Sequence, residues 1–102
     1  MQATQTSTLG PEVREFLRAL ASEGRQQVLM LFADHSELGV GRVAELAGVA
    51  QSTASQQLAE LRRGGLLTSR RDGKAVLYRA DVTGITRALN ALQVHLRSCC
   101  PT

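Results

Sequence analysis

The sequence VAQSTASQQLAELRR, residues 49–63, decides how this chain folds. Ala54, Leu58 and Leu61 recur at helical spacing, which places them in one apolar stripe of an amphipathic helix. The remaining face carries polar, amide and arginine side chains: Gln51, Ser52, Ser55, Gln56, Arg62 and Arg63. Amides and hydroxyls can hydrogen-bond base edges in the major groove of DNA, and arginines can hold phosphates. A polar helix face taken alone is more often merely solvated, and it is the neighbouring residues that favour a DNA-recognition helix here.

The residues on either side extend this prediction. Residues 43–46 are predicted to form a short apolar helix, and Gly48 can turn the chain sharply into the next one, which makes a helix-turn-helix. After the recognition helix, residues 66–71 and 74–80 are predicted to be strands joined by Asp72-Gly73, a favoured two-residue hairpin turn. The hairpin carries Arg70, Arg71 and Lys74 around its tip. It is either an ordinary solvated turn or, as its closeness to the helix favours, a wing that touches DNA.

Two helices are predicted before this unit. Pro11 suits a first helical turn, and the spacing of the apolar residues that follow predicts a helix ending near Ala21: Val13, Phe16, Leu17 and Leu20. Ser22 is the expected N-cap of a second helix over residues 23–35, with Val28, Leu29, Leu31 and Phe32 facing inward. His35, at its end, is predicted to be a surface or capping residue rather than a ligand.

The last predicted helix covers residues 82–98, with Asp81 as its N-cap. Its apolar residues follow a heptad spacing: Val82, Ile85, Leu89, Leu92 and Leu96. Ala88, Ala91 and Val94 add a second face of small residues. Such a helix has apolar side chains on more faces than its own domain can bury. A homodimer through the first and last helices is therefore expected. Two-fold symmetry would then match a pseudo-palindromic DNA site.

Length and composition agree with one mainly helical domain. The chain has 102 residues, which we divide into a flexible tail at 1–9, the domain at 10–98 and a thiol tail at 99–102. No run of apolar residues is long enough to span a bilayer, and residues 1–9 lack the features of a secretory signal. We therefore expect a cytoplasmic protein with no membrane partner.

Positive charge is concentrated around the recognition helix. Between residues 51 and 79 there are six basic residues and two acidic ones, a net charge of +4, whereas the whole chain carries +3. The basic residues are nearly all arginine, which suits bidentate contacts to phosphate. A basic patch at this position predicts binding to double-stranded nucleic acid.

The segment ELGVGRVAELAGVAQSTASQQLAELRRGGLLTSRRDGKAVLYRA resembles the ArsR/SmtB family of dimeric winged-helix repressors, which leave their operator when a metal, metalloid or other inducer binds. The resemblance implies that Gln51, Ser52, Ser55 and Gln56 face operator bases. It also implies that Arg71 and Lys74 lie on the wing. No cofactor is expected for DNA binding itself.

Two inducer sites known in that family are incomplete here. Where arsenite repressors carry Cys-x-Cys, this chain has Gly39 and Gly41, which cannot bind a metalloid. Of the zinc ligands on the terminal helices, His95 falls at one position, but Ser98 stands where an acidic residue or histidine is expected. Asp81 is at most a remnant of the other half, so a closed tetrahedral zinc site is not expected.

Cys99 and Cys100, the only cysteines, are adjacent and follow the last predicted helix. A structural disulfide is not expected in a cytoplasmic protein, and the ring closed by neighbouring cysteines would be strained. Thiolates select thiophilic centres. Because one chain offers two thiols, an organoarsenical with two free valences suits the pair better than inorganic arsenite or antimonite, unless His95 supplies a third ligand. We therefore expect a trivalent arsenical to act as inducer.

Two other interpretations remain open, and a third is disfavoured. The cysteines could sense oxidants or persulfides and make the protein a thiol redox switch. The chain could be a winged-helix regulator whose cysteines are not the sensor. An enzyme using Cys99 with His95 would lack a third orienting group and an oxyanion-binding turn, so no enzyme is expected.

Overall fold

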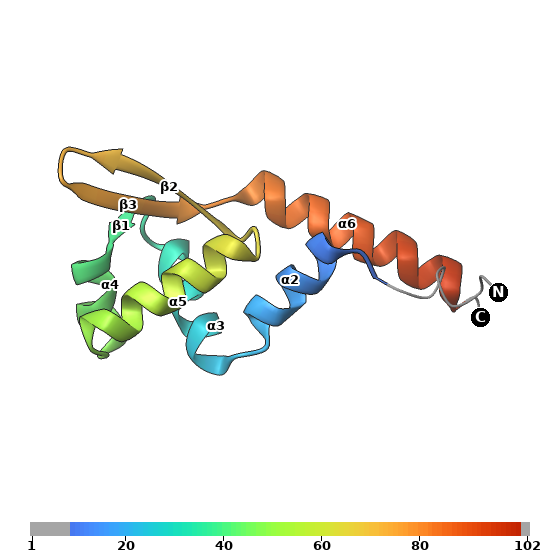
Figure 1. The fold of residues 1–102 in the computed structure, drawn as a ribbon, viewed down its shortest axis with the longest axis horizontal. Helices are drawn as coiled ribbons and strands as arrows, with labels where there is room; N and C mark the ends of the chain where they lie inside the picture. Colours follow the sequence, from blue (N-terminus) through green and yellow to red (C-terminus); the bar gives the residue numbers. More distant parts are fainter. Residues whose placement is uncertain (1–8, 101–102) are drawn as a thin grey trace.

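The computed structural model describes residues 9–100 (Figure 1). In chain order the elements are α2 (Pro11–Leu20), α3 (Glu23–Met30), the 3-10 turn η1 (Leu31–Ala33), β1 (Leu38–Gly39), α4 (Val40–Ala47), α5 (Gln51–Arg63), β2 (Leu67–Asp72), β3 (Ala75–Ala80) and α6 (Val82–Cys99). The predicted N-terminal tail, apart from Leu9, and the last two residues of the predicted thiol tail lie outside the described range. The prediction of a mainly helical domain with a small hairpin is confirmed.

The corner between α2 and α3 is built as the sequence indicated. Pro11 occupies the first turn of α2, and the Ser22 hydroxyl caps α3 by accepting a hydrogen bond from the Arg25 N–H at 3.3 Å. The Arg25 guanidinium then donates to the carbonyls of Ala19 at 2.8 Å and Arg18 at 2.9 Å. Because the last carbonyls of a helix have no partner within it, these contacts close the end of α2.

The second helix is shorter than the predicted residues 23–35, so that prediction was wrong. It ends at Met30 and tightens into η1. Leu31 and Phe32 continue the apolar spacing and pack against the core. The tighter turn nevertheless redirects the chain, so that Leu38 enters the sheet and is buried. His35 lies in the connection beyond the helix.

The sheet has a third strand that the sequence patterns did not predict. β1 pairs antiparallel with β3, placing Leu38 opposite Tyr78 and Gly39 opposite Leu77. The strand order is β1-β3-β2, so β3 is central. A two-residue strand is too short to show the alternation by which strands are recognised.

The hairpin turn lies one residue further along the chain than predicted. β2 and β3 pair in register from Leu67 opposite Ala80 to Asp72 opposite Ala75, so the turn is Gly73-Lys74 and not Asp72-Gly73. Gly73 has φ of +67°, and no described non-glycine residue has a positive φ. A positive φ at the first turn position alone is the pattern of a type II′ turn, which also matches the twist of paired strands.

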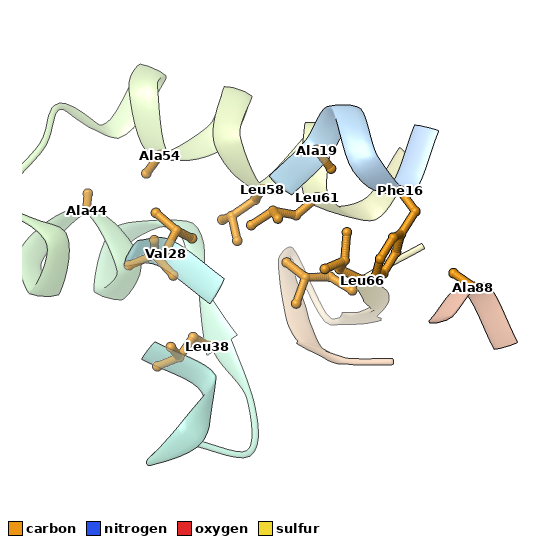
Figure 2. Packing of buried hydrophobic residues seen from close by; sticks show 12 residues of the cluster. Phe16, Ala19, Val28, Leu38, Ala44, Ala54, Leu58, Leu61, Leu66 and Ala88 are labelled. Carbon is orange, nitrogen blue, oxygen red and sulfur yellow. The ribbon is translucent and has the colours of Figure 1, made fainter. Parts of the chain in front are cut away.

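The apolar stripe of α5 forms the centre of the core. Ala54, Leu58 and Leu61 are all fully buried, which confirms the prediction for this helix. Figure 2 shows the residues that surround the stripe, which come from α2, α3, α4, the sheet and α6: Phe16, Ala19, Val28, Leu38, Ala44, Leu66 and Ala88. Burying each large aliphatic side chain contributes about 1.5–3 kcal/mol.

The end of α5 crosses α2 at a position where only glycine fits. A Cβ at Gly64 would lie 2.6 Å from the Cβ of Ala19 and 2.9 Å from the carbonyl oxygen of Glu15. Both distances are shorter than real side chains allow, so this glycine fixes how closely α5 approaches α2. The approach in turn sets the position from which the hairpin begins.

α6 packs on the domain mainly through small residues, together with Ile85 of its heptad seam, which is partly buried against the core. Gly84 and Ala88 are buried, whereas the seam residues Val82, Leu89 and Leu96 are 70%, 49% and 49% exposed. The helix runs one residue past the predicted end and extends away from the rest of the molecule (Figure 1). Its seam is therefore left open along most of its length.

Candidate DNA-binding surface and thiol pair

The helix-turn-helix is formed by α4 and α5. α4 is longer than the predicted residues 43–46, and α5 begins two residues later than the predicted Val49. Between them Gly48 has φ of 70°, and its N–H donates to the carbonyl of Ala44 at 2.9 Å. A left-handed glycine is the common way to end a helix and turn the chain sharply. It leaves only three residues, 48–50, between the end of α4 and the start of α5.

The predicted base-reading residues lie together at the start of α5. Gln51, Ser52, Ser55 and Gln56 are all exposed. Ser52, Ser55 and Gln56 lie away from the buried stripe, whereas Gln51 is at its N-terminal end, beyond the core. Ala50, the N-cap, has no side chain that can accept hydrogen bonds from the first N–H groups. The first turn of α5 therefore presents amides, hydroxyls and backbone donors to solvent, which are the groups that bind base edges and phosphates.

The amide-rich face ends at Gln56, because Gln57 turns inward. Its carboxamide is half-buried, and a Cβ at Gly24 would lie 2.8 Å from its Nε2. Its Oε1 is buried without a hydrogen-bond partner among the described residues. Gln57 thus packs α5 against the start of α3, a role that its residue type did not distinguish from that of Gln56.

The wing separates its two arginines onto opposite faces. Successive side chains of a strand alternate. Arg71, paired with Val76, therefore shares a face with Tyr78 and with Leu67, which is buried against α5 and the core. Arg70 points to the other face. The structure thus places Arg71 on the same side of the sheet as the candidate recognition helix. Lys74 is exposed in the turn at the tip.

Arg70 is held in an ion pair that sequence reasoning missed. Its Nε donates to one carboxylate oxygen of Glu37 at 2.7 Å and its Nη2 to the other at 2.8 Å. This hydrogen bonding is the main cause that lowers the pKa of Glu37 and raises the pKa of Arg70 from their ordinary values. The partner is 33 residues away in sequence, and no spacing pattern could have linked the two.

Arg62 and Arg63 lie at the far end of α5. Together with Ala59 and Tyr78 they line a hollow of about 400 Å³ between the helix and β3. The Arg63 guanidinium donates to the carboxylate of Glu60 at 3.1 Å. At 1.5 Å per residue, Arg62 is about 16 Å along the helix from Gln51. The predicted phosphate contact is thus well separated from the predicted base contacts.

The two cysteines lie at the other end of the molecule, where α6 ends (Figure 1). Both are exposed free thiols, and Cys99 is the last residue of the helix. The Cys99 Sγ lies 3.7 Å from the carbonyl oxygen of Leu96. A hydrogen bond with Cys100 is the largest cause that raises the pKa of the Cys99 thiol, and partial desolvation adds to it. Both thiols are accessible, and the raised pKa keeps Cys99 predominantly protonated at neutral pH.

The other candidate ligands, Asp81 and His95, are not grouped with the thiol pair. The Asp81 carboxylate caps α6 by accepting a hydrogen bond from the Gly84 N–H at 2.9 Å. His95 lines a hollow beside the start of α2, with its Nε2 buried and without a described hydrogen-bond partner. Within residues 9–100 of a single chain, no three histidine, cysteine or acidic side chains are grouped so that they could hold a metal ion.

Over the same range, every helix is too short or too polar to cross a lipid bilayer.

The sequence is similar to those of known bacterial regulatory proteins. Residues 22–69 match the model of the arsR family of bacterial regulatory proteins. The chain is 37% identical to the transcriptional activator HlyU of Vibrio cholerae over 74% of its own length and 69% of HlyU. It is 42% identical to the transcriptional regulator KmtR of Mycobacterium tuberculosis over 68% of its length, but spans only 52% of KmtR. It is 32% identical to a biofilm growth-associated repressor of Xylella fastidiosa, covering 79% of this chain and 70% of that one.

Solved structures give the same result. A homodimeric winged helix-turn-helix DNA-binding domain from Mycobacterium bovis superimposes with a TM-score of 0.67 at 35% identity, covering 81% of this chain and 76% of that one. A protein described as a possible transcriptional regulator for arsenical resistance gives a TM-score of 0.68 at 27% identity, with 80% and 84% coverage. Sequence and structure together show that this chain is a winged helix-turn-helix protein of the ArsR family of bacterial transcriptional regulators.

Proposed function

We propose that the protein is a homodimeric repressor that leaves its operator when a trivalent organoarsenical bridges Cys99 and Cys100. The observation that carries the proposal is the thiol pair itself. The only two cysteines of the chain are adjacent, exposed and unbridged at the end of α6, which is the helix expected at the dimer interface. Soft sulfur ligands select thiophilic centres.

DNA binding is the function that the other end of the molecule supports. The exposed amides and hydroxyls of α5 are suited to base edges, and the cations of the wing are suited to phosphate. Arg71 lies on the sheet face that also contacts α5, and Lys74 is at the tip. The helix and the wing can therefore contact one duplex together, in a major groove and along the neighbouring backbone.

Dimerisation is supported by the open seam of α6. The seam residues Val82, Leu89 and Leu96 are 70%, 49% and 49% exposed. Apolar side chains grouped in this way mark an interaction surface. The related domain from Mycobacterium bovis is homodimeric. A second copy of this chain on the seam would bring two thiol pairs near the dimer axis and space two recognition helices for one operator.

The number of ligands favours an organic arsenical. A monomethyl arsenic(III) dihydroxide has two exchangeable hydroxyl groups, and condensation with the two thiols forms two As–S bonds and releases two waters. Arsenic stays trivalent, so no oxidant or reductant is needed. Inorganic arsenite has three exchangeable groups, and no third ligand is grouped with the pair within the described part of one chain. Similarity to a protein described as a possible transcriptional regulator for arsenical resistance supports an arsenical as the inducer.

A redox switch is the second candidate, and the thiol chemistry argues against it. Oxidant-sensing cysteines react as thiolates, so they usually have a lowered pKa. Hydrogen bonding with Cys100 and desolvation raise the pKa of Cys99 instead. Condensation with an arsenical hydroxide consumes protonated thiols and does not require a lowered pKa. The raised pKa of Cys99 therefore fits arsenical binding better than reaction with peroxide.

Titration of the operator complex with arsenicals, under reducing conditions, tests the proposed selectivity. Methylarsenite should release the protein from a fluorescent operator duplex at a lower concentration than inorganic arsenite. The reason is that the two thiols of one chain can replace both exchangeable groups of methylarsenite. Fluorescence anisotropy gives the two midpoints. Equal midpoints for the two arsenicals would disprove the preference for organic arsenic, and release by neither would disprove arsenical sensing.

A further inference from the structure

The wing is joined to the helix-turn-helix by a very short sheet connection. β1 contributes only Leu38 and Gly39, and it runs directly into α4. The long hairpin formed by β2 and β3 therefore has only two residues of backbone pairing with the segment that begins the DNA-binding unit. Such a short strand offers few ladder hydrogen bonds to hold the hairpin at a fixed angle.

One side-chain contact reinforces this connection. Arg70 on β2 reaches Glu37, the residue before β1, and so spans all three strands, because β3 lies between the other two. Arg70 is opposite Leu77, and Leu77 is opposite Gly39, so these residues form one row across the sheet. The contact uses both carboxylate oxygens, the most direction-specific form of an arginine–carboxylate pair.

The other ion pairs among the described residues do not join these parts. Three lie within a single helix: Glu15 with Arg18, Arg42 with Glu45, and Glu60 with Arg63. The fourth joins Glu12 of α2 to Arg87 of α6, away from the wing. The Glu37 carboxylate is also the more enclosed partner of its own pair, with its side chain 24% exposed against 51% for Arg70.

We propose that Glu37 is a positioning residue for operator binding, which fixes the angle between the wing and the recognition helix through its two hydrogen bonds to Arg70. This inference rests on the proposed DNA-binding function. An acidic residue would thus strengthen binding to a polyanion. Glu37 does so by keeping Arg71 and Lys74 in register with the exposed face of α5, although its own charge repels DNA.

Substitution of Glu37 by glutamine distinguishes the effect of its contact with Arg70 on operator affinity from the effect of its negative charge. Loss of a negative charge near DNA should tighten binding, whereas loss of the tie should weaken it. Each phosphate contact at physiological salt is worth on the order of fivefold in affinity. If one or both wing cations lose register, the Glu37→Gln variant should bind its operator about five- to thirtyfold more weakly. The logarithm of the association constant decreases with the logarithm of the salt concentration. The steepness of this decrease should become smaller by about 0.9 for each lost contact.

Glu45→Gln is the matched control. It removes the same charge from the neighbouring α4, but its partner Arg42 lies within the same helix, so no tie between elements is lost. This variant should bind the operator as tightly as the wild type, or more tightly. An exchanged pair, Glu37→Arg with Arg70→Glu, can form the contact in the opposite direction and should recover most of the lost affinity.

Anisotropy titrations over a series of salt concentrations, on operator and unrelated duplexes, give the result. The inference holds if Glu37→Gln, but not Glu45→Gln, binds the operator more weakly and with a smaller salt dependence. The exchanged pair should restore both the affinity and its salt dependence. It is overturned if Glu37→Gln binds as tightly as Glu45→Gln, or if the exchanged pair restores thermal stability but not operator affinity. If the wild type itself bound no duplex, the DNA-binding function would fail rather than this inference.

Discussion

Replacing both cysteines, in a Cys99→Ser, Cys100→Ser variant, is expected to abolish the response to arsenicals and leave operator affinity unchanged. Serine keeps the size of the side chain but supplies a hard oxygen donor that does not select arsenic(III). Both residues are exposed at the end of α6, so the change should cost little stability. Coupling between an inducer and a second site is typically 5–150-fold, and this factor should fall to about one.

Single substitutions and one neighbouring residue provide the controls. Cys99→Ser and Cys100→Ser alone should each lose most of the response, because a single As–S bond has no chelate partner. His95→Gln should keep the response, since two thiols satisfy an organoarsenical. Operator release is followed by anisotropy and arsenic content by mass spectrometry of the native protein. A double serine variant that still responded fully would show that the sensor lies elsewhere.

Truncation of two amides at the start of α5 should produce the largest loss of DNA binding. Gln51 and Gln56 are both exposed near the start of the helix, and neither supports the core. A good amide contact to a base edge contributes about 1–3 kcal/mol of discrimination. A Gln51→Ala, Gln56→Ala variant should therefore bind its operator at least about thirtyfold more weakly. Binding to unrelated duplexes, which depends on phosphate contacts, should change little.

Gln27→Ala is the matched control for these amides. Gln27 is an exposed glutamine on α3, outside the helix-turn-helix. It should leave both specific and non-specific affinity unchanged. Competition between operator and unrelated DNA measures the ratio of the two affinities for each variant. If the double variant lost both affinities equally, α5 would contact the DNA backbone and not its bases.

Local patterns predicted the parts of the fold that depend on repeated spacing. The stripe of Ala54, Leu58 and Leu61 is regular over a whole helix, and all three residues are buried as expected. The caps at Ser22 and Asp81 also follow from residue type, since each side chain accepts the hydrogen bond predicted for it. These features are local, so a single sequence contains what is needed to recognise them.

Tertiary contacts decided the features that the sequence did not reveal. The apolar spacing of Leu31 and Phe32 indicated a longer helix, but pairing of Leu38 with Tyr78 requires the chain to turn after Met30. The hairpin turn moved by one residue because the register of β2 with β3 places Asp72 opposite Ala75. In both cases a distant strand set the boundary.

In the candidate site, too, some features could be predicted from local sequence and others depend on tertiary contacts. The residue types of α5 and the thiol pair could be identified directly, because each group is contiguous. Whether a wing arginine faces the recognition helix depends on strand alternation. The engagement of Arg70 by Glu37 depends on a contact between residues far apart in the chain. Likewise, Gln57 resembles Gln56 in the sequence, yet it packs against Gly24.

The central claim is that occupation of the thiol pair and binding of the operator oppose each other. It is tested most directly by measuring methylarsenite affinity with and without saturating operator DNA, alongside operator affinity with and without saturating methylarsenite. Linkage requires the two ratios to be equal, and a factor of about 5–150 is expected. A protein that stayed on its operator with unchanged affinity while both cysteines were bound to arsenic would contradict the account.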